Sequence, residues 1–184
     1  LIRELKTIFV DEGNLMCLTQ RHRFPTDYLE SLKALAIELN IRIVVAATYD
    51  ILEVWNHTAQ INRRMRTIHL KRYRQDVEKE YADFAGIVES FETDYELKKG
   101  VLTKKLGIIY QNTYGIPGEV ASLIERAIEM AVADSKKKVE WSDFQEAFHY
   151  PAQLRQLMKE ADAGELQLTR DWDKAEALAA QAEA

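Results

Sequence analysis

The run Leu5-Lys6-Thr7-Ile8-Phe9-Val10 leads directly into Asp11-Glu12-Gly13 near the start of the sequence. A short apolar run that ends in acidic residues and a glycine is typical of a strand followed by a turn. A second apolar run, Ile41-Arg42-Ile43-Val44-Val45-Ala46-Ala47, has the same character. Near-continuous apolar strands occur in parallel sheets that are covered on both faces, so we expect both runs to be buried on both sides.

A helix is predicted between the two runs. Pro25-Thr26-Asp27 supplies its cap and first turn, and apolar residues follow at helical spacing: Leu29, Leu32, Ala36 and Leu39. Strand, helix and strand within about 45 residues form a βαβ unit. A helical stretch over residues 51–62 and a short third strand, Thr67-Ile68-His69-Leu70, are expected to follow.

The pattern becomes helical after about residue 73. One apolar face recurs at spacings of three and four, at Val77, Tyr81, Phe84, Val88 and Phe91. Further helices are predicted around residues 102–109, 120–131 and 143–148, the last capped by Ser142. One more helix around residues 154–161 is expected to end at Gly164. We therefore predict α/β architecture followed by a small all-helical domain.

Composition narrows the class of protein. The chain has 184 residues, of which 47% are hydrophobic and 30% charged, which is typical of globular proteins. The single cysteine, Cys17, excludes an internal disulfide and fits the reducing cytoplasm. Apolar runs are far shorter than the roughly 18 residues that a membrane span needs, so no membrane partner is expected.

The net charge of −5 conceals an asymmetry. Residues 1–75 contain 12 Lys and Arg against 8 Asp and Glu, whereas residues 76–184 contain 13 against 22. The first part is therefore positive and could meet phosphates, although solvation of both parts explains the same numbers.

Asp11 and Glu12 form a pattern of the Walker B type. The crevice beyond the carboxyl ends of parallel strands is where ligands bind. There the first carboxylate, Asp11, can hold Mg²⁺ through water, and the second, Glu12, can orient or deprotonate an attacking water. The alternative is an ordinary solvated strand end.

Arginines in Asn62-Arg63-Arg64-Met65-Arg66 form a second candidate group. Guanidinium groups at the mouth of such a sheet can reach a phosphate held by a neighbouring subunit and stabilise charge during phosphoryl transfer. A basic helix end on the surface is the alternative.

Taken in order, these features resemble the later half of an AAA+ ATPase of the TnsC/TniB type, the ATP-dependent regulators of DNA transposition. The resemblance covers most of the chain. It rests on Asp11-Glu12, on Ala46-Ala47-Thr48-Tyr49-Asp50, on Gln60-Ile61-Asn62-Arg63-Arg64, and on Tyr114-Gly115-Ile116-Pro117-Gly118-Glu119.

The resemblance implies roles for individual residues. Asp11 would support Mg²⁺, Glu12 would activate water, and Thr48 would be the sensor on the adjacent strand. Either Arg63 or Arg64 would be the finger that acts in trans. Pro117 and Gly118 would contact the nucleotide from the helical lid.

It also implies partners. Such proteins bind ATP with Mg²⁺ between subunits and assemble as rings or helical filaments on double-stranded DNA. They link a target-selecting protein to the transposase. Arg21 and Arg23, in the loop after the Walker B residues, are candidates for contact with the DNA backbone. The implied domains are a partial core at 1–72, a lid at 73–148, and a C-terminal helix and tail at 149–184.

Three departures from the family pattern stand out. None of the seven glycines is followed by lysine, so the phosphate-binding loop Gly-Lys-Ser/Thr is absent and the 184 residues alone are expected to be inactive. Gly118-Glu119 stands where many relatives place a sensing arginine, and Ala47 stands where glycine is common. A replication-initiator or loader ATPase and a non-catalytic helical interaction module are the alternative functions.

Overall fold

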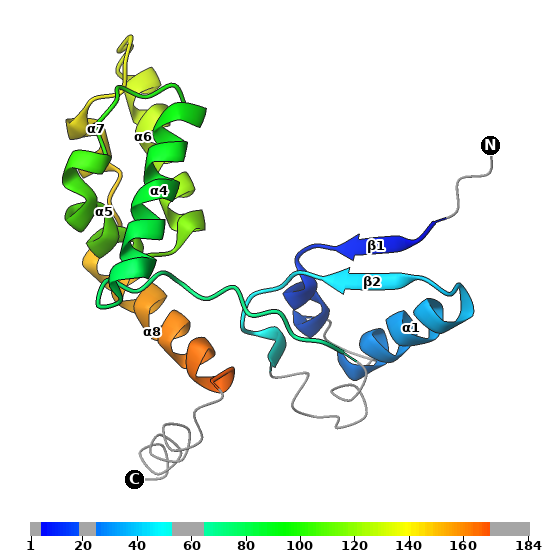
Figure 1. Cartoon of the computed structure of the whole chain (residues 1–184). Helices are drawn as coiled ribbons and strands as arrows, with labels where there is room; N and C mark the ends of the chain where they lie inside the picture. The colour runs from blue at the N-terminus through cyan, green and yellow to red at the C-terminus, as the bar shows by residue number, and fades with distance from the viewer. Residues whose placement is uncertain (1–4, 19–24, 53–64, 170–184) are drawn as a thin grey trace. The chain divides into compact units, whose positions relative to one another are not determined.

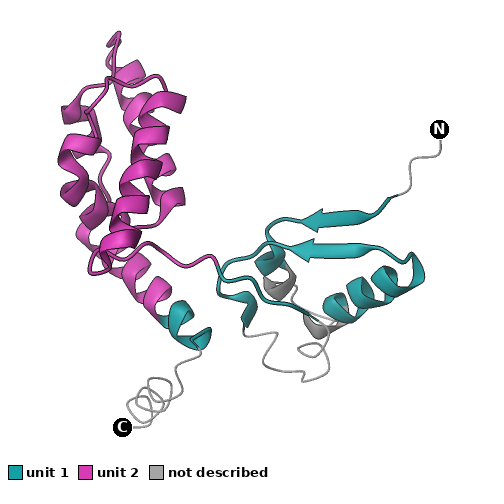
Figure 2. Cartoon of the chain, in the orientation of Figure 1, with its two compact units in different colours: residues 1–69, 163–184 teal, residues 70–162 magenta. Residues whose placement is uncertain are grey.

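The structure is a computed structural model that describes residues 5–18, 25–52 and 65–169. Two compact units are present: one comprises Leu1–His69 and Ala163–Ala184, and the other, called the helical unit below, comprises Leu70–Asp162 (Figure 2). The elements in chain order (Figure 1) are β1 (Thr7–Val10), η1 (Gly13–Leu18), α1 (Pro25–Glu38), β2 (Arg42–Val45), α4 (Glu78–Asp94), η2 (Thr103–Lys105), α5 (Leu106–Thr113), α6 (Pro117–Ala133), α7 (Trp141–Glu146) and α8 (Pro151–Gln167).

The predicted βαβ unit is confirmed. β1 and β2 pair in parallel, with Thr7 opposite Arg42 and Val10 opposite Val45, and α1 joins them. A parallel pair needs such a crossover because its strands run in the same direction. The mixed α/β prediction therefore holds for the described residues in the form of a two-stranded parallel sheet and many helices.

The prediction that both faces of the sheet are buried is wrong for this chain. Side chains alternate between the faces of a strand. Ile8, Val10, Ile43 and Val45 are partly buried on one face. On the other, Phe9 is 78% exposed and its register partner Val44 is 41% exposed. Within the described residues, α1 is the helix that packs against the sheet, so the second apolar face has no covering layer there.

The helical unit has a core of its own. The predicted face of α4 is confirmed, since Phe84 and Val88 are fully buried. They pack in one cluster with Ile109 of α5 and with Leu123 and Ile124 of α6. Figure 1 shows α4, α5 and α6 lying side by side in this unit. The apolar periodicity of the sequence therefore identified the helices that build this core.

Two helix ends differ from the sequence predictions. α7 begins after Glu140 and not at Ser142, because Glu140 and Asp143 form a capping box in which each side chain accepts the other residue's backbone N–H. α8 continues through Gly164 to Gln167. A Cβ at position 164 would lie 2.0 Å from Cγ of Tyr49, so glycine permits this close approach and is retained inside the helix.

Two further predictions concern residues 51–70. Residues 65–70 form no strand, and none of the described strands pairs with them. Ile51 and Leu52 are buried at the start of a helical turn, but the remainder of the helix predicted to reach residue 62 lies outside the described residues. In the part of the chain that the structure describes, no helix is long and apolar enough to cross a membrane.

Candidate functional site

The carboxyl ends of β1 and β2 bring three predicted site residues to one edge of the sheet. Asp11 and Glu12 follow the last residue of β1, and Thr48 lies three residues after the end of β2. Backbone pairing continues past both strands, since the Ala46 N–H donates to the Val10 carbonyl at 2.8 Å. All three side chains are exposed. A ligand that binds at this edge could therefore meet two carboxylates and a hydroxyl.

The backbone at Glu12 is held in an uncommon conformation. Its φ is +53°, in the left-handed region that residues other than glycine seldom adopt. Its N–H donates to Oδ1 of Asp11 at 2.8 Å, and its carbonyl accepts the Leu15 N–H at 2.9 Å. Such strain costs on the order of 1 kcal/mol and persists where surrounding contacts fix it, often at functional sites.

Gly13 is a residue of the site that the sequence reading did not single out. Its N–H donates to the Ala46 carbonyl at 2.8 Å, which fastens the turn after β1 to the end of β2. A Cβ at this position would lie 2.3 Å from Cγ1 of Val45. Only glycine fits this approach without displacement of the Val45 side chain. The signal in the sequence was a glycine directly after Asp11-Glu12.

Tyr49 connects the end of β2 to the segment that follows the predicted arginine finger. The Tyr49 hydroxyl and Nε2 of His69 share a hydrogen bond of 2.8 Å, and the two rings meet edge to face with centroids 5.7 Å apart. Tyr49 directly follows Thr48 in the chain. Residues 65–69 are thereby fixed near the strand end although they form no strand.

The four arginine candidates lie outside the described residues. This applies to the finger candidates Arg63 and Arg64 and to the DNA-contact candidates Arg21 and Arg23. Their predicted roles therefore stay predictions.

Pro117 and Gly118 begin α6 in the helical unit, where proline at the first helical position has no N–H to leave unpaired. A Cβ at Gly118 would meet nothing within 4 Å, so this position is open. The next residue is Glu119. Its carboxylate accepts a hydrogen bond of 2.7 Å from His149 Nε2 when that nitrogen is protonated. Pro117 and Gly118 belong to a different compact unit from Asp11, Glu12 and Thr48.

Arg126 has an internal role in the helical unit. Its Nε donates to the Ala147 carbonyl at 3.1 Å, and its Nη2 lies 3.5 Å from Nε2 of His149. These contacts hold the segment before α8 to α6. The Arg126 guanidinium is therefore engaged within the helical unit.

Mg²⁺ prefers oxygen ligands, and Asp11 supplies a carboxylate at this edge of the sheet. Within the described residues no group of three His, Cys, Asp or Glu lies close enough to enclose a metal ion. Asp11 nevertheless fits, because it is an exposed carboxylate at a strand end. Mg²⁺ is commonly bound through one or two carboxylates, waters and substrate phosphates and not by a cage of protein ligands.

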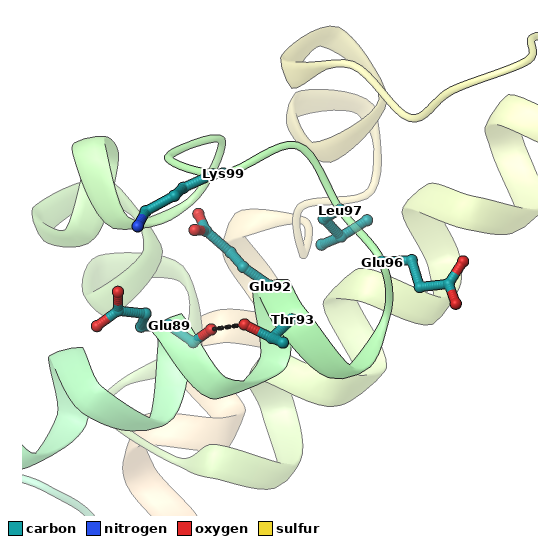
Figure 3. Close-up of a pocket in the computed structure, with 6 residues that line it drawn as sticks. All are labelled: Glu89, Glu92, Thr93, Glu96, Leu97 and Lys99. Carbon is teal, nitrogen blue, oxygen red and sulfur yellow. Dashed lines mark hydrogen bonds between the residues drawn. The ribbon is translucent and has the colours of Figure 1, made fainter.

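A shallow acidic pocket lies in the helical unit, at the end of α4 (Figure 3). Its lining residues are Glu89, Glu92, Thr93, Glu96, Leu97 and Lys99. Glu92 does not face a ligand there, because its carboxylate accepts backbone N–H groups from Gly100, Leu102 and Thr103. Three of the six lining residues are glutamates against one lysine, so the pocket is unsuited to phosphates and is not the candidate nucleotide site.

Comparison with known proteins agrees with the predicted resemblance over the first part of the chain. Residues 3–75 match the family model TniB, described as bacterial TniB protein. The matched range includes Asp11, Glu12, Thr48, Arg63 and Arg64 but not Pro117 or Gly118. A search of curated proteins finds no match to the chain.

Proposed function

Because residues 3–75 are TniB-like and so connect the chain with DNA transposition, we propose that it belongs to an ATP-dependent regulator of transposition. In this proposal the chain supplies the water-activating part of an AAA+ ATP site. The observation that carries it is the edge at which Asp11, Glu12 and Thr48 lie together inside the matched range. The exposed sheet face at Phe9 and Val44 supports it, because a larger AAA+ core would cover that face.

Each residue at the edge has a separate task in the proposed reaction. Asp11 holds the water shell of Mg²⁺, which neutralises the charge of the phosphates. Glu12 accepts a proton from the water that attacks the γ-phosphate, a role typically worth about 10²–10⁴ in rate. The Thr48 hydroxyl positions that water. Pro117 and Gly118 contact the nucleotide from the helical unit.

The proposed partners follow from the same assignment. Subunits assemble as a ring or helical filament on double-stranded DNA and link a target selector to the transposase. Arg21 and Arg23 contact the DNA backbone, which requires no base recognition. Arg63 or Arg64 reaches the ATP held by the neighbouring subunit.

A mixing experiment tests this arrangement in the regulator that carries this segment together with a phosphate-binding loop. Arg63→Ala or Arg64→Ala should lower the rate of phosphate release on DNA by about 10³-fold for the true finger, because charge in the transition state loses its partner. Mixed with Glu12→Gln subunits, that variant should regain activity, since intact Glu12 and intact arginine then meet at some interfaces.

The other arginine variant serves as the matched control. It should retain most of the phosphate-release activity without being mixed with Glu12→Gln subunits. Mixtures that show no recovery with either arginine variant contradict action in trans.

A further inference from the structure

Three side chains, those of Arg72, Tyr114 and Asp162, lie together where the helical unit begins and ends. Arg72 lies two residues after its first residue, Leu70, and Asp162 is its last residue. Arg72 Nη2 donates to Oδ1 of Asp162 at 3.0 Å. Its guanidinium carbon lies 3.9 Å from the ring centroid of Tyr114, which stands in the turn between α5 and α6. We call Arg72, Tyr114 and Asp162 the clamp.

The clamp is a closed triangle of interactions. The Tyr114 hydroxyl donates to both carboxylate oxygens of Asp162, at 2.8 and 3.0 Å. The Arg72 side chain is only 15% exposed. A guanidinium over an aromatic face is attracted to it, and hydrogen bonds to a carboxylate are stronger than neutral ones. Each member therefore holds the other two, unlike an isolated surface ion pair, which contributes little.

Protonation of the hydroxyl is secured at ordinary pH. Burial, followed by the hydrogen bond to Asp162, raises the pKa of Tyr114 to about 12, although the charge of Arg72 opposes the shift. The Tyr114 hydroxyl therefore remains a hydrogen-bond donor to Asp162 at every pH well below about 12.

The segment that follows Arg72 is fixed by hydrogen bonds that do not involve Asp162. The Tyr73 N–H donates to the Gly115 carbonyl at 2.9 Å, and the Tyr110 hydroxyl donates to the Tyr73 carbonyl at 3.0 Å. Gly115 has a φ of +72°, and a Cβ there would lie 2.1 Å from the Tyr73 carbonyl oxygen. Residues 72–75 are thus anchored on the turn between α5 and α6 whether or not α8 is held.

Within the helical unit, α8 lacks comparable anchoring, although Gly164, in the other unit, lies against Tyr49. Before Ala161 its residues are all exposed or half-buried, and it packs extensively on no other element among the described residues. Asp162 itself has a 54% exposed side chain. The end of α8 in the helical unit therefore depends on contacts that can open without disturbing the core.

We propose that the clamp is a releasable latch, in which Asp162 docks α8 on Arg72 and Tyr114 and can let it detach while the rest of the helical unit stays folded. Tyr114 places the latch two residues before Ile116-Pro117-Gly118, at the start of α6. This inference does not depend on ATP hydrolysis.

Hydrogen exchange of the 184-residue chain, followed by mass spectrometry, tests the latch. Asp162→Asn should speed exchange of the amides in residues 151–162 about tenfold, because two charge-assisted contacts are lost, and leave residues 120–131 of α6 unchanged. Tyr114→Phe should have a smaller effect of the same kind. Asp76→Asn is the matched control, since it removes a carboxylate from the exposed Arg74–Asp76 pair and should change neither segment.

Two further readouts separate a latch from general destabilisation. The double variant Tyr114→Phe with Asp162→Asn should exchange no faster than Asp162→Asn alone, because the triangle opens as one unit. In Asp162→Asn the pKa of Tyr114 should fall below about 12. It is measured from the difference in absorbance between the Asp162→Asn chain and the double variant as the pH is raised. Unchanged exchange in α8, or equal acceleration in α6, would overturn the proposal.

Discussion

Glu92→Ala is expected to lower the free energy of unfolding of the chain by about 3 kcal/mol. Glu92 lies in α4 and is 3% exposed. Its carboxylate accepts the N–H groups of Gly100, Leu102 and Thr103 at 2.9, 2.6 and 2.8 Å. Alanine would leave these donors unpaired in a buried place, and they hold the loop that leads into η2 and α5. Chemical denaturation at neutral pH measures the loss.

Glu89→Ala is the matched control. Glu89 is one turn earlier on α4, lines the same pocket and is exposed, so its removal should change stability by less than about 0.5 kcal/mol. Equal effects of the two substitutions would show that the hydrogen bonds to Glu92 do not anchor the loop.

The contribution of Glu92 to the free energy of unfolding should depend on pH. Burial opposes ionisation of Glu92, but the backbone hydrogen bonds from Gly100, Thr103 and Leu102 outweigh it and lower its pKa from 4.5. The ionised form is therefore favoured by folding, and its contribution is present above pH 4.5 and lost as the pH falls toward the lower pKa of the folded chain. Glu92→Gln should lose this part of the acid sensitivity, which denaturation curves at several pH values below 4.5 would measure.

Glu12→Gln is expected to lower ATP turnover at least about a hundredfold in the regulator that carries this segment with a phosphate-binding loop. Glutamine preserves the size and hydrogen-bonding shape of the side chain but cannot accept the proton of the attacking water. ATP should therefore stay bound. Phosphate release and retained nucleotide, measured on the same DNA-bound sample, separate loss of hydrolysis from loss of binding.

The backbone of Glu12 provides a control for stability. Asparagine tolerates the left-handed region in which Glu12 lies, so Glu12→Asn should leave the unfolding free energy unchanged within about 0.5 kcal/mol or raise it. Turnover should be lost in this variant as well. Normal turnover in Glu12→Gln would contradict the assignment of Glu12, whatever the stability.

Local patterns in the sequence predicted much of the fold. The apolar runs before Asp11 and after Asn40 became β1 and β2, and the spacing of Phe84 and Val88 identified the buried face of α4. The face of the sheet at Phe9 was a different case. Its apolar character shows that it suits burial, but which layer covers it depends on structure that the described residues do not contain.

Interactions between distant residues escaped the sequence reading. Asp162 is 90 residues from Arg72 and 48 from Tyr114, and no local pattern links them. Serine is a preferred cap, which favours Ser142 as the cap of α7, whereas the pair Glu140 and Asp143 satisfies both backbone groups at once. At the candidate site, motif spacing predicted Asp11, Glu12 and Thr48, but Gly13 and the Tyr49–His69 pair depend on packing.

The most direct test of the central claim, that this chain supplies the water-activating part and not the phosphate-binding part of an ATP site, is a calorimetric titration with Mg²⁺ and ATP. The 184-residue chain alone should show no binding in the micromolar range, because none of its glycines is followed by lysine and the phosphates lack their cradle. The same chain joined to a phosphate-binding loop should bind. Micromolar binding of ATP by the 184 residues alone would contradict the account.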